Sequence, residues 1–141
     1  MKPTLIKNNP QFWLLLKFFL PEMNRKRTIV AFADKIYSRS PITPDLWEHE
    51  KMHCQQQGGR VITAIPWVIM YLFSKKFRFR MELEAYRVQY EFCRRKYGLV
   101  KRLSLLSRMA KDLSGPLYGE LVDYHMAKEL IADISLNKHG I

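Results

Sequence analysis

The chain has 141 residues, of which 48% are hydrophobic and 13% aromatic, with a mean hydropathy of -0.25. Such a chain can bury enough apolar surface to form a core, which argues against general disorder, and it is too short for two ordinary domains. We therefore expect one domain over residues 1–141. The formal net charge of +11 favours anionic partners, namely an acidic protein, a nucleic acid or an anionic membrane surface.

Cysteine content and apolar segments bear on the compartment. Two cysteines, Cys54 and Cys93, are too few for a disulfide framework, which favours a reducing, cytoplasmic environment. The apolar segments 12–20 and 61–73 are both shorter than the roughly 20 residues that a bilayer crossing needs. The first lacks a cleavage site for a signal peptide, and Pro66 interrupts the second. We expect no transmembrane span, and a buried or surface-inserting helix over 61–73.

Two features are expected in the N-terminal part of the chain. The first 22 residues predict a short apolar helix ended by Pro21, followed by a basic cluster at 24–27. Residues 28–37 are rich in β-branched and aromatic side chains with Ala33-Asp34 at their middle, which predicts a strand or a tight hairpin. This is the only good strand signal in the sequence.

Helices are expected through the remainder of the chain. Thr43 suits the cap position, Pro44 the first helical position, and Asp45 the positive end of the helix dipole. This helix should run to Gln57 and stop at Gly58-Gly59. Further helices are expected at 61–74, bent at Pro66, and at 79–97, 100–113 and 117–135. The predicted fold class is mostly α (α+β), with a small strand or hairpin before the second helix.

The segment 49–53 reads His-Glu-Lys-Met-His and lies inside a predicted helix. Residues four apart share a helical face, so His49 and His53 can grip one metal ion, while Glu50 is rotated by about 100° and can reach a water on that ion. With 4 histidines and 8 glutamates in 141 residues, the pattern His-Glu-x-x-His is expected by chance only about 0.006 times in such a chain. A zinc ion with Glu50 as general base would suit metal-assisted peptide hydrolysis.

A third ligand is needed, and two carboxylates on the predicted helix 79–97 compete for the role. The metzincin pattern fails, because Gln56 and Gly59 replace its glycine and its third histidine. Glu82 projects about 60° from the apolar stripe of the helix, whereas Glu84 projects about 140° away among charged residues. Glu84 therefore resembles a solvated ion-pair residue, and Glu82 is the better candidate ligand. The stripe itself comprises Phe79, Leu83, Tyr86, Tyr90, Cys93 and Tyr97.

The motif His49-Glu50-x-x-His53, followed by a helix with Glu82-x-x-Ala85, resembles the gluzincin arrangement of zinc metallopeptidases. The fuller string with Gln56 is similar to small HExxHxxQ domains of bacteria and phages, over about residues 28–90. The resemblance implies a helical zincin-like domain, with His49, His53 and Glu82 as Zn2+ ligands and Glu50 as general base.

Several residues are candidates for orienting the ligands or stabilising an oxyanion at the predicted site. Many gluzincins have an aspartate where this chain has Tyr86, so Tyr86, or Gln56 projecting near His49, is a candidate to orient an imidazole. An ordinary polar surface role for Gln56 is equally compatible with the sequence. Candidates for stabilising an oxyanion are Tyr118, Tyr124 and His125, although each is more simply a packed aromatic or a satisfied histidine. The terminal His139 is assigned no role.

Three basic segments interleave with aromatic residues, at 25–27, 75–80 and 94–96. They are compatible with nucleic-acid binding, but a solvated basic face that docks an acidic partner or lipid headgroups explains them more simply. The sequence thus favours a zinc peptidase acting on an unknown peptide or protein substrate. The alternatives are a zinc-stapled structural or virion-associated protein and a basic nucleic-acid-associated module.

Overall fold

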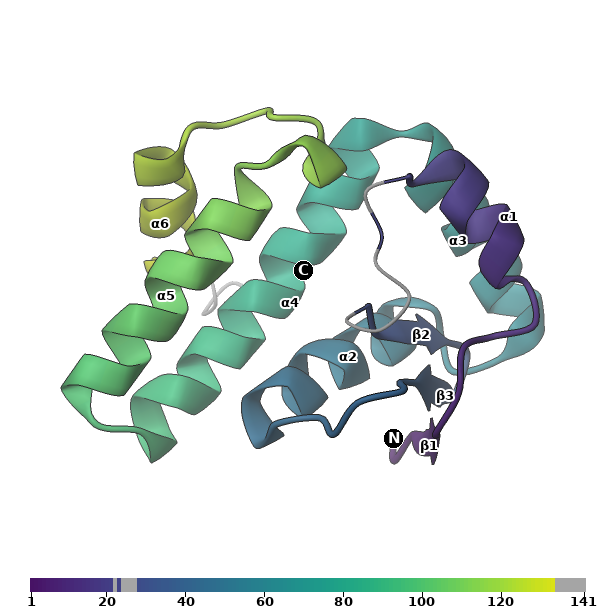
Figure 1. Cartoon of the computed structure of the whole chain (residues 1–141), viewed down its shortest axis with the longest axis horizontal. Helices are drawn as coiled ribbons and strands as arrows, with labels where there is room; N and C mark the ends of the chain where they lie inside the picture. Colours follow the sequence, from purple (N-terminus) through teal and green to yellow (C-terminus); the bar gives the residue numbers. More distant parts are fainter. Residues whose placement is uncertain (22, 24–27, 134–141) are drawn as a thin grey trace.

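The computed structural model describes residues 1–21, 23 and 28–133. Its elements follow one another in the order β1 (Thr4–Ile6), α1 (Trp13–Phe19), β2 (Val30–Phe32), β3 (Lys35–Tyr37), α2 (Pro44–Gln56), α3 (Val61–Phe73), α4 (Lys75–Lys96), α5 (Leu99–Leu113), a 3-10 helix η1 (Pro116–Tyr118) and α6 (Tyr124–Ala132). The protein is therefore mostly helical with a small sheet, and the predicted fold class is confirmed (Figure 1).

The sheet has three strands in the order β1-β3-β2. Strands β2 and β3 pair antiparallel around the Ala33-Asp34 turn, where Ala33 adopts a left-handed φ of 55°, so the predicted hairpin is confirmed. Strand β1 pairs parallel to β3 and was not predicted. A three-residue strand carries almost no local signal, and this one is fixed by pairing with a segment about 30 residues away in the chain.

The N-terminal helix is shorter than the sequence suggested. Helix α1 begins at Trp13, after a turn in which the Trp13 amide donates to the carbonyl of Pro10. The side chains of Trp13 and Leu16 are buried, while Leu14 and Phe18 point to solvent. The predicted helix over the first 22 residues was therefore wrong in its start, and the basic cluster at 24–27 lies outside the described residues.

Helix α2 starts at Pro44, as predicted, but its first turn is built differently from the expectation. The Thr43 side chain makes no capping hydrogen bond. Asp45 lies in the first turn of α2, as expected, and it is only 3% exposed. Its carboxylate accepts hydrogen bonds from Gln89 Nε2 at 2.7 Å and from the Tyr97 hydroxyl at 3.2 Å. Asp45 thus joins the start of α2 to α4.

The end of α2 is tied to the sheet by Gln57, which is 1% exposed. Its side-chain Oε1 accepts from the backbone N–H of Ala33 at 2.7 Å, and its Nε2 donates to the carbonyl of Ala31 at 2.9 Å. These two bonds satisfy outward-facing backbone groups of the hairpin. The chain then turns through Gly58, whose φ of 73° favours glycine.

Helices α3 and α4 are separated only by Ser74, whose hydroxyl accepts from the backbone N–H of Phe77 at 3.2 Å and caps α4. Helix α4 therefore begins four residues before the predicted start. Arg78 was placed in a basic surface segment, but it is 5% exposed and donates to the carbonyls of Leu117 and Tyr71. A buried guanidinium anchors three segments here and takes no part in a solvated basic face.

The C-terminal half packs α4 against α5 and α6 around one apolar cluster (Figure 1). The predicted stripe of α4 lies in or against this cluster. The predicted helix 117–135 was wrong in its interior, because Gly119 and Glu120 take left-handed φ values of 82° and 51° and separate η1 from α6. Residues 134 and 135 lie outside the described part of the chain. Among the described residues, no helix is long and apolar enough to cross a bilayer.

Candidate metal centre

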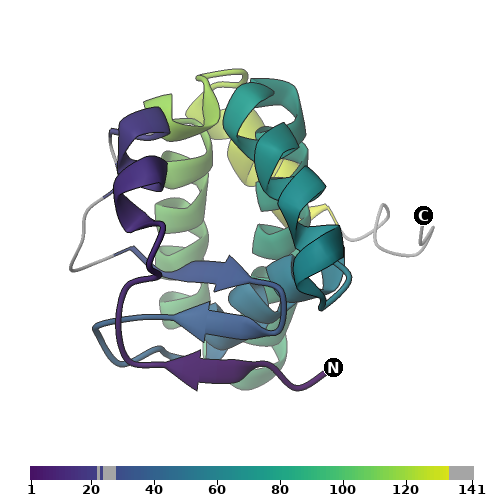
Figure 2. The same cartoon turned by 90° about the vertical axis from the view of Figure 1, so that its right-hand side faces the viewer.

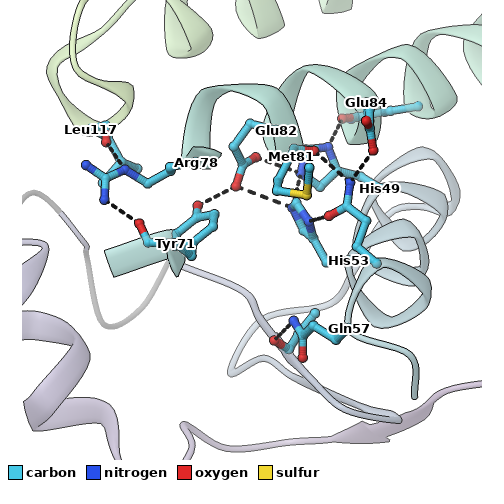
Figure 3. Close-up of polar contacts among 12 residues, drawn as sticks. His49, His53, Gln57, Tyr71, Arg78, Met81, Glu82, Glu84 and Leu117 are labelled. Atoms are coloured by element: carbon cyan, nitrogen blue, oxygen red, sulfur yellow. Dashed lines mark hydrogen bonds and ion pairs between the residues drawn. The ribbon is translucent and has the colours of Figure 1, made fainter. Parts of the chain in front are cut away.

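Packing of α2 against α4 brings His49, His53 and Glu82 together at the middle of the molecule (Figure 3). The two imidazole Nε2 atoms lie 3.2 Å apart. His49 Nε2 lies 3.2 Å from Glu82 Oε2, and His53 Nε2 lies 3.4 Å from Glu82 Oε1. All three side chains are buried, at 3–5% exposure. These residues can therefore present three ligand atoms to one ion.

The separations fit a tetrahedral metal ion. With ligands at about 2.0–2.1 Å from zinc, neighbouring ligand atoms of a tetrahedron lie about 3.3–3.4 Å apart. The two imidazole nitrogens, 3.2 Å apart, match this spacing, and each lies within 3.4 Å of one oxygen of the Glu82 carboxylate, His49 of Oε2 and His53 of Oε1. One ligand atom from each of the three residues lies within 4.8 Å of the other two, which is compact enough for one ion. In addition, Glu82 Oε2 is fully buried and has no hydrogen-bond partner among the described residues. A cation would satisfy that oxygen, so the donor set fits a metal.

The His49 ring is oriented by a chain of hydrogen bonds that runs to the start of α2. His49 Nδ1 lies 3.0 Å from Gln89 Oε1, and the Gln89 amide donates to Asp45 at 2.7 Å. Because the Asp45 carboxylate can only accept, the Gln89 oxygen must face His49, and Nδ1 carries the proton. The lone pair of the neutral ring is then on Nε2, which faces Glu82.

The His53 ring is oriented by a second chain of the same design. His53 Nδ1 lies 2.9 Å from Gln56 Oε1, and the Gln56 amide donates to Glu84 Oε2 and to the carbonyl of Met81, both at 3.0 Å (Figure 3). Glu84 is partly exposed, as predicted, but it accepts a hydrogen bond from Gln56, because the crossing of α2 over α4 places Gln56 against it. Gln56 also orients His53, and not the His49 ring near which it was predicted to project.

A tyrosine from α3 reaches the same carboxylate. The Tyr71 hydroxyl donates to Glu82 Oε1 in a short hydrogen bond, and its ring stacks on Trp67, which in turn lies 5.8 Å from the His53 ring. Burial, and then the charge of Glu82, raise the pKa of Tyr71 well above its ordinary value. The hydroxyl therefore stays protonated as a donor. Sequence reasoning missed Tyr71, since only the packing of α3 on α4 brings it to the site.

Charge at the site is strongly coupled. Burial alone would lower the pKa of His53, but the charge of Glu82 and a hydrogen bond with it outweigh burial and raise the pKa to about 9. Burial likewise opposes ionisation of Glu82, yet the charge of His53 and the close approach of both imidazoles hold its pKa well below the ordinary range. In the metal-free protein, a proton on His53 therefore balances the Glu82 carboxylate near neutral pH.

Glu50 lies between the two histidines on α2 and is 7% exposed. Burial raises its pKa above the ordinary glutamate value, while the charges of His49 and His53 oppose this rise and that of Glu82 adds to it. Its position within the motif sets it beside the ligands without making it one of the three converging residues. A carboxylate so placed can exchange a proton with a water at the site.

The remaining predicted residues divide into those near the site and those away from it. The Tyr86 ring packs edge-on against His49 at 4.6 Å between centroids, a ring contact in place of the expected hydrogen bond. Burial, and then the charge of Glu82, raise the pKa of both Tyr86 and Tyr118, and the Tyr118 ring lies edge-on to that of Tyr86 at 6.5 Å between centroids. Tyr124 and His125 pack against each other on α6, where His125 is exposed. His139 lies outside the described residues.

Neither cysteine is part of the cluster. Cys54 and Cys93 are both free and buried, and burial raises the pKa of Cys54 to about 12 and that of Cys93 to about 11. Thiols in this state are poor nucleophiles and poor metal ligands near neutral pH. The donors available at this centre are therefore two imidazoles and one carboxylate.

Comparisons with models of protein families, with curated proteins and with solved structures find no match to this chain. The centre is accordingly interpreted from its own geometry and chemistry.

Proposed function

We propose that the protein is a zinc-dependent peptidase of gluzincin type, with His49, His53 and Glu82 as the ligands and Glu50 as the general base. The observation that carries the proposal is the convergence of two imidazole Nε2 atoms and one carboxylate, 3.2 to 3.4 Å apart, in a buried site. Three protein ligands from this set leave a fourth position open, which distinguishes catalytic zinc sites from the four-ligand structural ones.

The chemistry divides between the ion and the chain. Zinc held by these three residues supplies a Lewis acid that activates water toward a carbonyl carbon. Glu50 takes the proton from the attacking water and later delivers it to the departing amine. Gln89 and Gln56 fix the tautomer of each histidine, so that both rings present a lone pair to the site.

Hydroxyl donors near Glu82 suit the charge that develops on a carbonyl oxygen. Tyr118 keeps its proton, because burial and then the charge of Glu82 raise its pKa, whereas the hydroxyl proton of Tyr71 is already donated to Glu82. A preorganised donor in a site with little water stabilises a developing oxyanion more than it would in bulk solvent. Of the residues predicted for this role, Tyr118 is the one that the fold supports.

The structural alternative is a zinc staple without catalysis, and Glu50 argues against it. A second buried carboxylate raises the electrostatic cost of the site, because burial, and to a smaller extent the charge of Glu82, raise the pKa of Glu50. A purely structural site gains nothing from that cost, whereas hydrolysis requires a base. The basic-module alternative has less support, since Arg78 of the basic segment 75–80 is buried.

The test compares Glu50→Gln with the parent protein on a broad peptide library, with zinc content measured by native mass spectrometry. The variant should retain one zinc ion, because Glu50 is no ligand, and lose at least about a hundredfold in peptide cleavage. Glu48→Gln is the matched control on the same helix, since Glu48 is partly exposed and pairs only with Lys51 among the described residues.

Cleavage undiminished in Glu50→Gln would refute the assignment of the base. A parent protein that binds zinc tightly and cleaves nothing in the library would favour the structural alternative.

A further inference from the structure

Helices α1 and α3 present large apolar side chains to solvent. On α1, Leu14 is 81% and Phe18 79% exposed, and they lie one turn apart on one face. On α3, only Ala64 is buried. Four of the exposed apolar residues of α3 follow one another at helical spacing, and they are Ile62, Ile65, Ile69 and Phe73, at 76%, 49%, 52% and 69% exposure. We call these two sets the apolar face.

The two helices form one continuous surface. A shallow hollow between them is lined only by apolar side chains, with Leu15 from α1 and Ile65 and Ile69 from α3. The rings of Phe19 and Phe73 meet at 5.0 Å between centroids, joining the helices at their other end. Figure 2 shows both helices on the side of the molecule that faces the viewer, in front of the longer helices. Single exposed apolar residues are ordinary, but a contiguous patch of this kind marks an interaction surface.

The charged residues on α1 and at the two ends of α3 are all basic. Residues 1–21 contain three lysines and no acidic residue, and residues 58–81 contain five basic residues and no acidic one. Arg60 is exposed at the start of α3, and Lys75 and Lys76 are exposed just beyond its end. The apolar face is therefore bordered by cations at both ends of α3, and the acidic residues of the chain lie in other segments.

We infer that the apolar face docks on the surface of a bilayer that contains anionic lipids, with α1 and α3 lying in the plane of the interface. A 13-residue helix is about 20 Å long, too short to cross a bilayer but suited to lie along it. Apolar side chains on the outer face and cations at both ends of the helix are the features by which helices bind anionic membrane surfaces. An apolar protein partner would not require this uniform positive border.

The opposite side of α3 carries Trp67 and Tyr71, which pack on His53 and bond to Glu82. Docking through the outer face leaves these contacts intact, so membrane binding is independent of the hydrolytic proposal. The Glu50→Gln protein should therefore bind vesicles like the parent.

The test is co-sedimentation with vesicles of phosphatidylcholine alone and with about 30% phosphatidylglycerol added. Parent protein should bind the second kind far more strongly. Phe18→Ser and Ile62→Ser should each weaken that binding about tenfold or more, since each removes a large side chain that would leave water. Val100→Ser is the matched control, because Val100 is 84% exposed on α5, and it should bind within twofold of the parent.

Three results would overturn the inference. The first is absence of binding to anionic vesicles at low salt. The second is binding that Phe18→Ser and Ile62→Ser leave unchanged, which would indicate attraction by the basic residues alone. The third is self-association of the parent in ultracentrifugation, lost in both variants and without vesicle binding, which would assign the apolar face to a second copy of the chain. Circular dichroism of each variant verifies folding.

Discussion

Replacing Gln89 with leucine tests whether the hydrogen-bond chain behind His49 sets metal affinity. The substitution keeps the approximate volume of the side chain but removes the acceptor 3.0 Å from His49 Nδ1 and the donor 2.7 Å from Asp45. The imidazole then loses the contact that fixes its tautomer and ring orientation. Loss of such a partner typically weakens metal binding about 10- to 100-fold, which corresponds to about 1.4–2.8 kcal/mol of binding free energy.

The metal-free protein should also lose stability, for a separable reason. Asp45 is 3% exposed, and its carboxylate accepts side-chain hydrogen bonds from Gln89 and Tyr97 among the described residues. The variant keeps only the bond from the Tyr97 hydroxyl, so it buries a poorly satisfied carboxylate. An unsatisfied buried group costs about 1–3 kcal/mol, and a charged one more. Urea denaturation in the presence of a chelator measures this term alone, without the contribution of the metal.

Zinc affinity is measured by competition with a chromophoric chelator, on protein verified as folded. Gln55→Leu is the matched control, because Gln55 is an exposed glutamine on α2, and it should bind zinc within twofold of the parent. Gln56→Leu should resemble Gln89→Leu, since Gln56 holds His53 in the same way. A Gln89→Leu protein that is less stable yet binds zinc as tightly as the parent would refute the orienting role and leave Gln89 a packing residue.

Three further outcomes are expected. Glu82→Ala should lose most of its zinc, measured by native mass spectrometry. Glu84→Ala should keep its zinc, because Glu84 contacts Gln56, which in turn contacts the ligand His53. Zinc loss in Glu84→Ala and not in Glu82→Ala would show that the wrong carboxylate was chosen. Because the pKa of His53 is about 9 in the metal-free protein, zinc binding at pH 7 should release about one proton from it, measured by calorimetry in buffers of different ionisation enthalpy. That release should disappear as the pH rises through 9, and its absence at pH 7 would mean that His53 is already neutral. Gln57→Ala should lower the free energy of unfolding by about 2–4 kcal/mol, because it leaves two backbone groups of the hairpin unpaired. Urea denaturation measures this change, with Gln55→Ala at an exposed position of α2 as the control. Equal changes in the two variants would contradict the role of Gln57.

The sequence was sufficient for features that depend on local spacing. His49 and His53 are one helical turn apart, so their shared face follows from the period of the helix alone. Pro44 and Gly58 mark the ends of α2 through their own backbone restrictions. The hairpin around Ala33-Asp34 was recognised for the same reason, since both strands and the turn lie within ten residues.

Contacts between segments far apart in the chain were decided only by the tertiary structure. Helical projection ranked Glu82 above Glu84 as a ligand. It did not predict the hydrogen bond between Gln56 and Glu84, because the projection of one helix contains no information on where α2 crosses α4. The same lack concealed the roles of Gln89 and Tyr71, which are ordinary residues on their own helices. Hydrogen bonds across helices depend on the crossing angle and offset of two packed surfaces, which no single-helix period encodes.

Burial showed the same division between local pattern and packing. Composition marked segment 61–73 as apolar, and either a buried or a surface-inserting helix was compatible with it. The structure leaves its outer face in solvent and uses its inner face to hold Glu82 through Tyr71. An apolar side chain is attracted to any apolar surface, so the sequence predicts that α3 packs against apolar groups without identifying them. Which face of α3 stays exposed depends on the positions of α1, α4 and the sheet.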